Sequence, residues 1–122
     1  MTNMAYMFYQ ATSFNGDLSS WDVSSVTNMY EMFLAALDFN SDISSWDVSS
    51  VSSMYRMFEN SDINCDLSNW DVSSVTNMHA MFNAAPFNGD VSTWDVSSVY
   101  NMSYMFQTSS FNGDISNWDV SV

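Results

Sequence analysis

The chain has 122 residues, enough for one domain. It carries 14 acidic side chains against one basic side chain, Arg56, for a net charge of −13. A surface that binds phosphates needs Lys and Arg, so nucleic acid and anionic membranes are poor partners, whereas cations, basic proteins and neutral glycans fit better. No apolar run approaches the roughly 18 residues of a membrane-spanning helix, and no signal peptide is evident.

One phrase recurs along the chain: WDVSSVTNM at 21–29, with close copies at 46–54, 70–78 and 94–102 and a shortened copy at 118–122. Its tryptophans are spaced 25, 24, 24 and 24 residues apart. Repeats of this length are typical of stacked architectures, because one unit is too small to bury its own apolar side chains. We therefore expect a single solenoid domain over 1–122, with about five repeats, as a fragment or short version of a longer array.

Each repeat predicts a strand followed by a helix. The stretch from Asp17 to Val23 is short, rich in β-forming residues and preceded by Asn-Gly, which predicts a strand after a turn. From Val26 to Ala36, apolar residues at offsets 0, 3, 6, 7 and 10 predict one face of a short helix. The expected fold class is an α/β repeat solenoid, with a parallel sheet on one side and helices on the other. The repeated Trp, Met and Phe form its core.

The pattern FNGDISNWDVSxVTNMxxMFxxA resembles the bacterial surface-protein repeat of unknown function called DUF285, known from mycoplasma lipoproteins and some microbial eukaryotes. The resemblance extends from Thr2 to Ser121. The family is similar to surface antigens of the BspA type, which implies a leucine-rich-repeat-like solenoid. It also implies a cell-surface or secreted location and a function in adhesion or protein binding. It supplies no catalytic residues.

The repeated aspartates are the candidate polar site. Two series run through the repeats: Asp17, Asp42, Asp66, Asp90 and Asp114, and Asp22, Asp47, Asp71, Asp95 and Asp119. Three interpretations stay open: the carboxylates accept hydrogen bonds from backbone N–H groups, or they bind Ca²⁺ through rows of oxygen ligands, or they are simply solvated. The sequence contains no DxDxDG loop, which argues against calcium. A third series, of asparagines, accompanies them: Asn15, Asn40, Asn64, Asn88 and Asn112.

No catalytic constellation is evident, so we expect a non-enzymatic protein without a cofactor. Cys65 stands where other repeats have Gly or Ser, which indicates a small residue in a turn, with a reactive thiol as the alternative. His79 replaces Tyr30 and Tyr55 at a surface position and has no second His beside it. No nucleophile elbow, P-loop or zinc signature is present.

The expected function is that of a surface or secreted interaction scaffold with an unknown protein or glycan ligand. The alternative is a calcium-dependent adhesive or self-assembling module. The polar strand face around Asp17 and Ser19 suits a repetitive ligand such as a glycan, and the lack of a Thr ladder argues against ice. The chain opens within a repeat, with Met1 at a valine position, and an uncovered strand at Ile115–Val120 would favour end-to-end homo-association.

Overall fold

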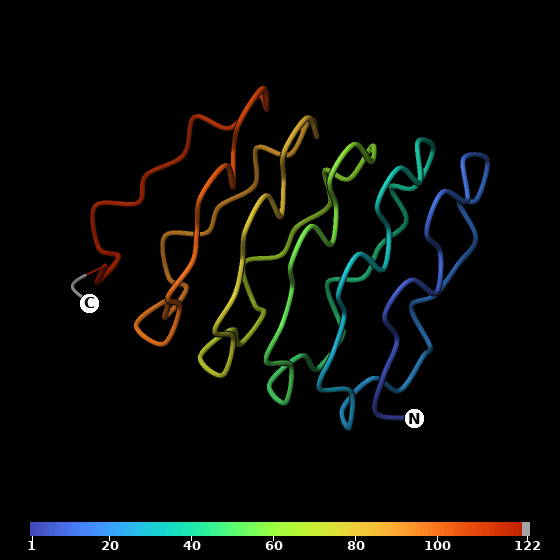
Figure 1. The fold of residues 1–122 in the computed structure, drawn as a ribbon, viewed down its shortest axis with the longest axis horizontal. Helices are drawn as coiled ribbons and strands as arrows, with labels where there is room; N and C mark the ends of the chain where they lie inside the picture. Colours follow the sequence, from blue (N-terminus) through green and yellow to red (C-terminus); the bar gives the residue numbers. More distant parts are fainter. Residues whose placement is uncertain (121–122) are drawn as a thin grey trace.

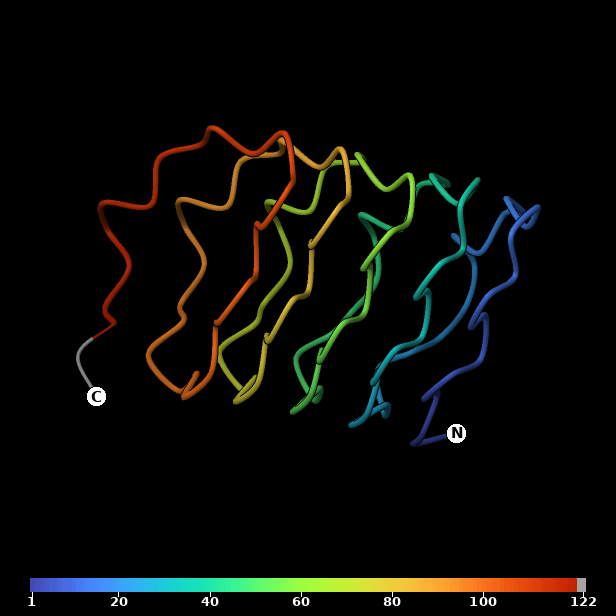
Figure 2. The ribbon, with the colours of Figure 1, turned by 45° about the horizontal axis from the view of Figure 1, so that its top comes forward.

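A computed structural model describes residues 1–120. The backbone of each repeat makes one turn around the long axis of the molecule, here called a coil. Successive coils lie side by side from the N-terminal to the C-terminal end (Figures 1 and 2). Four parallel bridges set the register, joining Asn3 to Asn28, Asn28 to Ser53, Ser53 to Asn77 and Asn77 to Asn101. The coils therefore begin at residues 3, 28, 53, 77 and 101.

The predicted α/β solenoid is wrong, because the described residues contain no helix and no strand beyond these isolated bridges. The bridges also fall in the segments that were predicted to be helical. We call these the ladder segments: residues 3–11, 28–36, 53–61, 77–85 and 101–109.

Backbone dihedral angles exclude a helix in the ladder segments. In the second coil Glu31 has φ 50° and Ala35 has φ 57°, and the equivalent residues of every coil also have positive φ. Right-handed helices require negative φ, and L-residues enter the left-handed region only at a cost. These residues occupy the third position of four-residue turns, where a positive φ reverses the chain. One such turn is closed by the Met32 N–H, which donates to the Met29 carbonyl at 3.2 Å.

Alternate N–H groups of a ladder segment instead donate to the next coil. Met29 donates to Ser53, Glu31 to Tyr55, Phe33 to Met57 and Ala35 to Glu59, at 2.8 to 3.0 Å. The same four bonds recur at every junction between successive coils. The N–H groups in between close local turns, so the backbone is satisfied without a helix or a regular sheet.

The predicted strand over Asp17–Val23 is also wrong, because this stretch contains no bridge to another coil and the N–H groups of Ser19 and Trp21 form local bonds. The Trp21 N–H donates to the Leu18 carbonyl at 3.0 Å, closing a turn, and the Val26 N–H donates to Val23 at 2.9 Å, closing another. The stretch from Ile115 to Val120 likewise forms no strand, and both of these side chains are exposed. The shortened repeat at 118–122 extends beyond the described residues.

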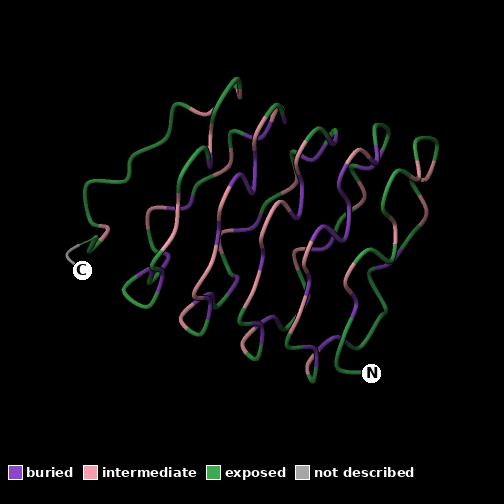
Figure 3. Ribbon diagram, in the orientation of Figure 1, coloured by how far each residue is buried: buried purple, intermediate pink, exposed green. Residues whose placement is uncertain are grey.

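The predicted core is confirmed. Val26, Met29, Met32, Phe33 and Ala36 are all fully buried, and buried segments run through the central coils in Figure 3. The Phe rings of successive ladder segments stack 5.2 to 5.7 Å apart: Phe8, Phe33, Phe58, Phe82 and Phe106. Each Trp from the second coil onward donates its indole N–H to a carbonyl of the preceding coil, as Trp46 does to Leu18 at 2.9 Å. Apolar pattern thus determines which residues are buried, whatever the backbone conformation.

Candidate binding surfaces

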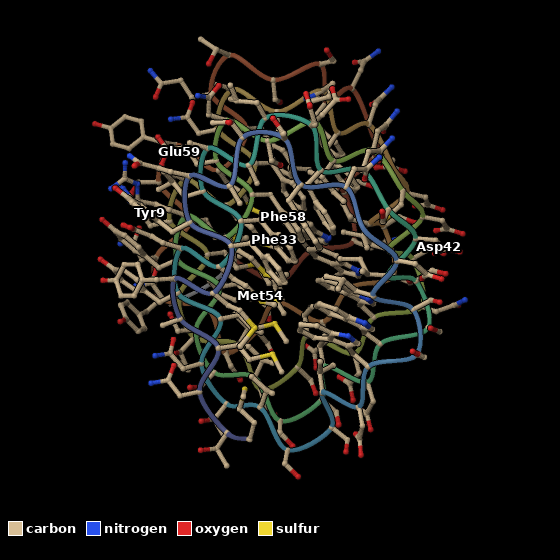
Figure 4. All side chains as sticks on the ribbon, turned by 90° about the vertical axis from the view of Figure 1, so that its right-hand side faces the viewer. Tyr9, Phe33, Asp42, Met54, Phe58 and Glu59 are labelled. Carbon is tan, nitrogen blue, oxygen red and sulfur yellow. The ribbon has the colours of Figure 1, made fainter. Side chains whose placement is uncertain are left out.

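The charged residues divide the surface into two sides. All 12 aspartates lie outside the ladder segments, which carry only Glu31, Glu59 and Arg56 among charged side chains. The ladder segments therefore have a net charge of −1, and the aspartates account for the remaining −12 of the total of −13. Figure 4 shows Tyr9 and Glu59 on one side of the stack and Asp42 on the opposite side, with Phe33 and Phe58 between them. The near-neutral side is a surface that the sequence did not lead us to expect.

Aromatic side chains run along this near-neutral side through all five coils. We call them the tyrosine strip: Tyr6, Tyr9, Tyr30, Tyr55, His79 and Tyr104. Neighbouring ring centroids lie 4.5 to 5.9 Å apart. Tyr30, Tyr55 and His79 stack nearly parallel, so their faces cover one another and their edges and polar atoms remain at the surface. Tyr6 and Tyr104, towards the two ends, are 53% and 60% exposed.

The charged groups of the near-neutral side are bonded to one another. Arg56 donates to Glu31 at 3.1 Å and also to Glu59, and its guanidinium lies 5.9 Å from the Tyr55 ring centroid. The bond to Glu59 and the two glutamate charges raise the pKa of Arg56, so it stays charged. Burial, with a smaller contribution from the Glu31 charge, raises the pKa of Tyr30 to about 12. The Tyr30 hydroxyl therefore stays protonated at physiological pH.

The aspartates act as turn caps. The carboxylate of Asp17 accepts the Ser19 N–H at 2.9 Å, and that of Asp22 accepts the Ser24 N–H at 3.0 Å and the Ser24 hydroxyl at 2.6 Å. The equivalent N–H bonds occur at Asp42, Asp66, Asp90 and Asp114, and at Asp47, Asp71 and Asp95. The interpretation by backbone bonds is confirmed for these nine residues. Asp119 is not free of partners either.

Hydrogen bonding to the charged form of a carboxylate favours its ionisation. The Ser24 hydroxyl and then the Ser24 N–H lower the pKa of Asp22, and Ser116 lowers the pKa of Asp114 through its N–H and then its hydroxyl. Within residues 1–120 no three carboxylate, imidazole or thiol groups are gathered as a metal site would require. Since all these aspartates are exposed, water also screens the repulsion between them.

Asparagine side chains tie the coils together on the aspartate side. The Asn15 amide oxygen accepts the Asn40 N–H at 2.9 Å, and Asn40, Asn64 and Asn88 each accept the N–H of the next asparagine in the series. These bonds join adjacent coils, whereas the aspartates bond within one coil. The third polar series of the sequence is therefore a stacking device.

Cys65 and His79 fit structural roles. The half-buried Cys65 thiol has its pKa raised by burial, which disfavours the reactive thiolate. At the equivalent Gly89 a side chain has little room, because a Cβ there would lie 2.8 Å from the Phe87 ring. The coil that contains Cys65 has the smaller Ile63 in place of that Phe. His79 stacks on Tyr55 and its Nδ1 lies 2.7 Å from the Ser103 hydroxyl.

These features define a tandem-repeat protein in which most of the repeated polar groups bond within or between stacked coils. No helix in residues 1–120 is long and apolar enough to span a membrane. The chain belongs to the DUF285 family, described as a mycoplasma protein of unknown function, which it matches over residues 1–85 and 59–122. No curated protein and no solved structure matches the chain.

Proposed function

We propose that this chain is a non-enzymatic interaction module of a cell-surface or secreted protein, and that the tyrosine strip binds its protein or glycan ligand. The carrying observation is the separation of the surface into two sides, with an aromatic strip on the side that lacks aspartates. Exposed aromatic residues that adjoin one another mark binding surfaces in soluble proteins. The repeated aspartates, in contrast, are occupied in capping turns.

The composition of the near-neutral side supports a binding role. Its exposed residues are mainly Tyr, Asn, Gln, Ser and Thr, accompanied by the half-buried Arg56, a mixture that resembles the contact surfaces of antibodies. Tyrosine supplies a large contact area at low conformational cost, and amides and hydroxyls supply adaptable hydrogen bonds. The stacked rings are held in place by their neighbours, so little ordering is required on binding.

The test uses beads coated with the chain and cultured epithelial cells as the probe. We expect the coated beads to adhere more than albumin-coated beads, and a variant with Tyr6→Ser, Tyr55→Ser and Tyr104→Ser to lose most of the difference. A matched control changes three exposed serines outside the strip: Ser50→Asn, Ser74→Asn and Ser98→Asn. Trypsin treatment of the cells abolishes binding to a protein ligand, and periodate treatment abolishes binding to a glycan.

Circular dichroism must show that the variants fold like the wild type, since Tyr55 is half-buried. Adhesion no greater than that of albumin would overturn the proposed function. Equal adhesion of the tyrosine and serine variants would show that the strip is not the binding surface.

A further inference from the structure

The loops along one edge of the stack depart from the repeat in length as well as in sequence. The loop that follows each ladder segment varies in both sequence and length, and these loops form the upper edge in Figure 1. The two aspartates outside the capping series, Asp38 and Asp62, are in these loops, and so is Pro86, the single proline. Insertions in repeat proteins map to loops on one side, which is often where the ligand binds.

A shallow groove of about 380 Å³ runs across this edge from the second coil to the fifth. Leu37, which is 47% exposed, forms one wall, and Thr108 and Ser110 line the groove from the fifth coil. Ala84, Ala85 and Pro86 contribute an apolar part of the lining, while Asn60, Ser61 and Asp62 contribute polar groups. The accessible lining of the groove is more polar than apolar, and it combines hydrogen-bonding groups with a smaller apolar part.

The Asp62 carboxylate differs from the capping aspartates. It forms no side-chain hydrogen bond and no ion pair within residues 1–120, whereas Asp42 and Asp66 each hold a serine N–H. The one arginine of the chain, Arg56, is bonded to Glu31 and Glu59. The groove thus contains an exposed carboxylate beside apolar surface, and no basic group of the chain neutralises it.

We propose that this groove binds a Lys or Arg side chain from a basic segment of a partner protein. The cationic end would pair with Asp62, and the apolar stem would lie along Leu37 and the Ala84–Pro86 surface, since such side chains bury their stems while keeping the charge in water. The net charge of −13 would attract such a segment from a distance. This site is separate from the tyrosine strip, so neither test decides the other.

The probe is a fluorescein-labelled peptide of five Gly-Lys units, with five Gly-Ser units as the neutral control, measured by fluorescence anisotropy in 20 mM and 150 mM salt. We expect the lysine peptide alone to bind, and Asp62→Asn to weaken its binding at least fivefold. Asp38→Asn is the matched control because it removes the same charge from a neighbouring loop outside the groove lining. It should change the affinity less than twofold.

A second variant tests the apolar wall without changing the charge. Leu37→Asn should weaken the lysine peptide two- to threefold, and Tyr55→Ser in the tyrosine strip should leave its affinity unchanged. Equal losses in Asp62→Asn and Asp38→Asn would overturn the proposal, because the overall field would then hold the peptide. It would also be overturned if cellohexaose displaced the peptide from the wild type and bound equally well to Asp62→Asn, since the groove would then be a glycan site.

Discussion

Replacing Ala35 by glycine should stabilise this protein, although the same change in a helix is destabilising. Ala35 has φ 57° and donates its N–H to the Glu59 carbonyl at 2.9 Å. An L-residue pays about 1–2 kcal/mol in the left-handed region, and glycine avoids this cost. The greater conformational freedom of glycine in the unfolded chain opposes this gain and destabilises the protein by about 0.5–1 kcal/mol. The expected net gain is about 0.5–1 kcal/mol, which raises the melting temperature by about 2–5 °C in a domain of this size.

The neighbouring Ala36 provides the matched control. It is fully buried and its φ is not positive, so Ala36→Gly loses a packed methyl group and gains unfolded-state freedom. We expect it to lower the free energy of unfolding by about 1–2 kcal/mol. Urea unfolding followed by circular dichroism measures both changes. If Val26–Ala36 were a helix, both glycine variants would have a lower free energy of unfolding than the wild type. A destabilised Ala35→Gly protein would therefore refute the backbone described here.

Three other predictions concern the turn caps and the stacked tryptophans. Capping aspartates with a lowered pKa, such as Asp22 and Asp114, contribute stability that is full above their unfolded-state pKa near 4 and is lost as pH falls through the lower folded values. Melting temperatures measured from pH 7 to pH 2 should therefore fall only below about pH 4, and an earlier loss near pH 6 would contradict this assignment. Because the carboxylates hold serine N–H groups, neither EDTA nor millimolar Ca²⁺ should shift the melting temperature by more than about 1 °C, and an increase of many degrees with Ca²⁺ would revive the calcium alternative. Trp70→Phe removes the indole bond to the Ile43 carbonyl and some buried volume, so it should lower the free energy of unfolding in urea by about 2–3 kcal/mol. Trp21→Phe, at a 37% exposed position, should lower it by less than about 1 kcal/mol. Equal losses would show that the indole bond contributes little.

The sequence predicted the stacking register and the core, because both depend on recurrence alone. The spacing of the tryptophans and the apolar offsets from Val26 to Ala36 determine which side chains can lie together, and those residues are buried. The capping role of Asp22 was also among the predictions, although its bond to the Ser24 N–H caps a turn and not the predicted helix.

Backbone conformation could not be predicted in the same way. The residues with positive φ share no sequence feature. The position of Glu31 in the repeat holds Tyr, Glu, Arg or Ala, the position of Ala35 holds Gln, Ala, Asn or Thr, and glycine occurs at neither. Ala35 is a good helix former by itself, and bonds to neighbouring coils override that preference. The tyrosine strip was missed for a related reason. Tyr6 and Tyr104 lie one residue after the position of Tyr30 in the repeat, so only the folded chain brings these rings together.

The alternating bonds of the ladder segments also make the stack electrically polar. The peptide group between Asn28 and Met29 accepts from Met4 on one side and donates to Ser53 on the other, and the peptide groups before Glu31, Phe33 and Ala35 are oriented the same way. Dipoles of about 3.5 D each therefore add along four columns that cross the coils, as they do along a helix axis. In a regular parallel sheet successive peptide groups would point in opposite directions and largely cancel. The columns point their N–H ends towards the C-terminal coil, and each added repeat would lengthen all four dipoles together.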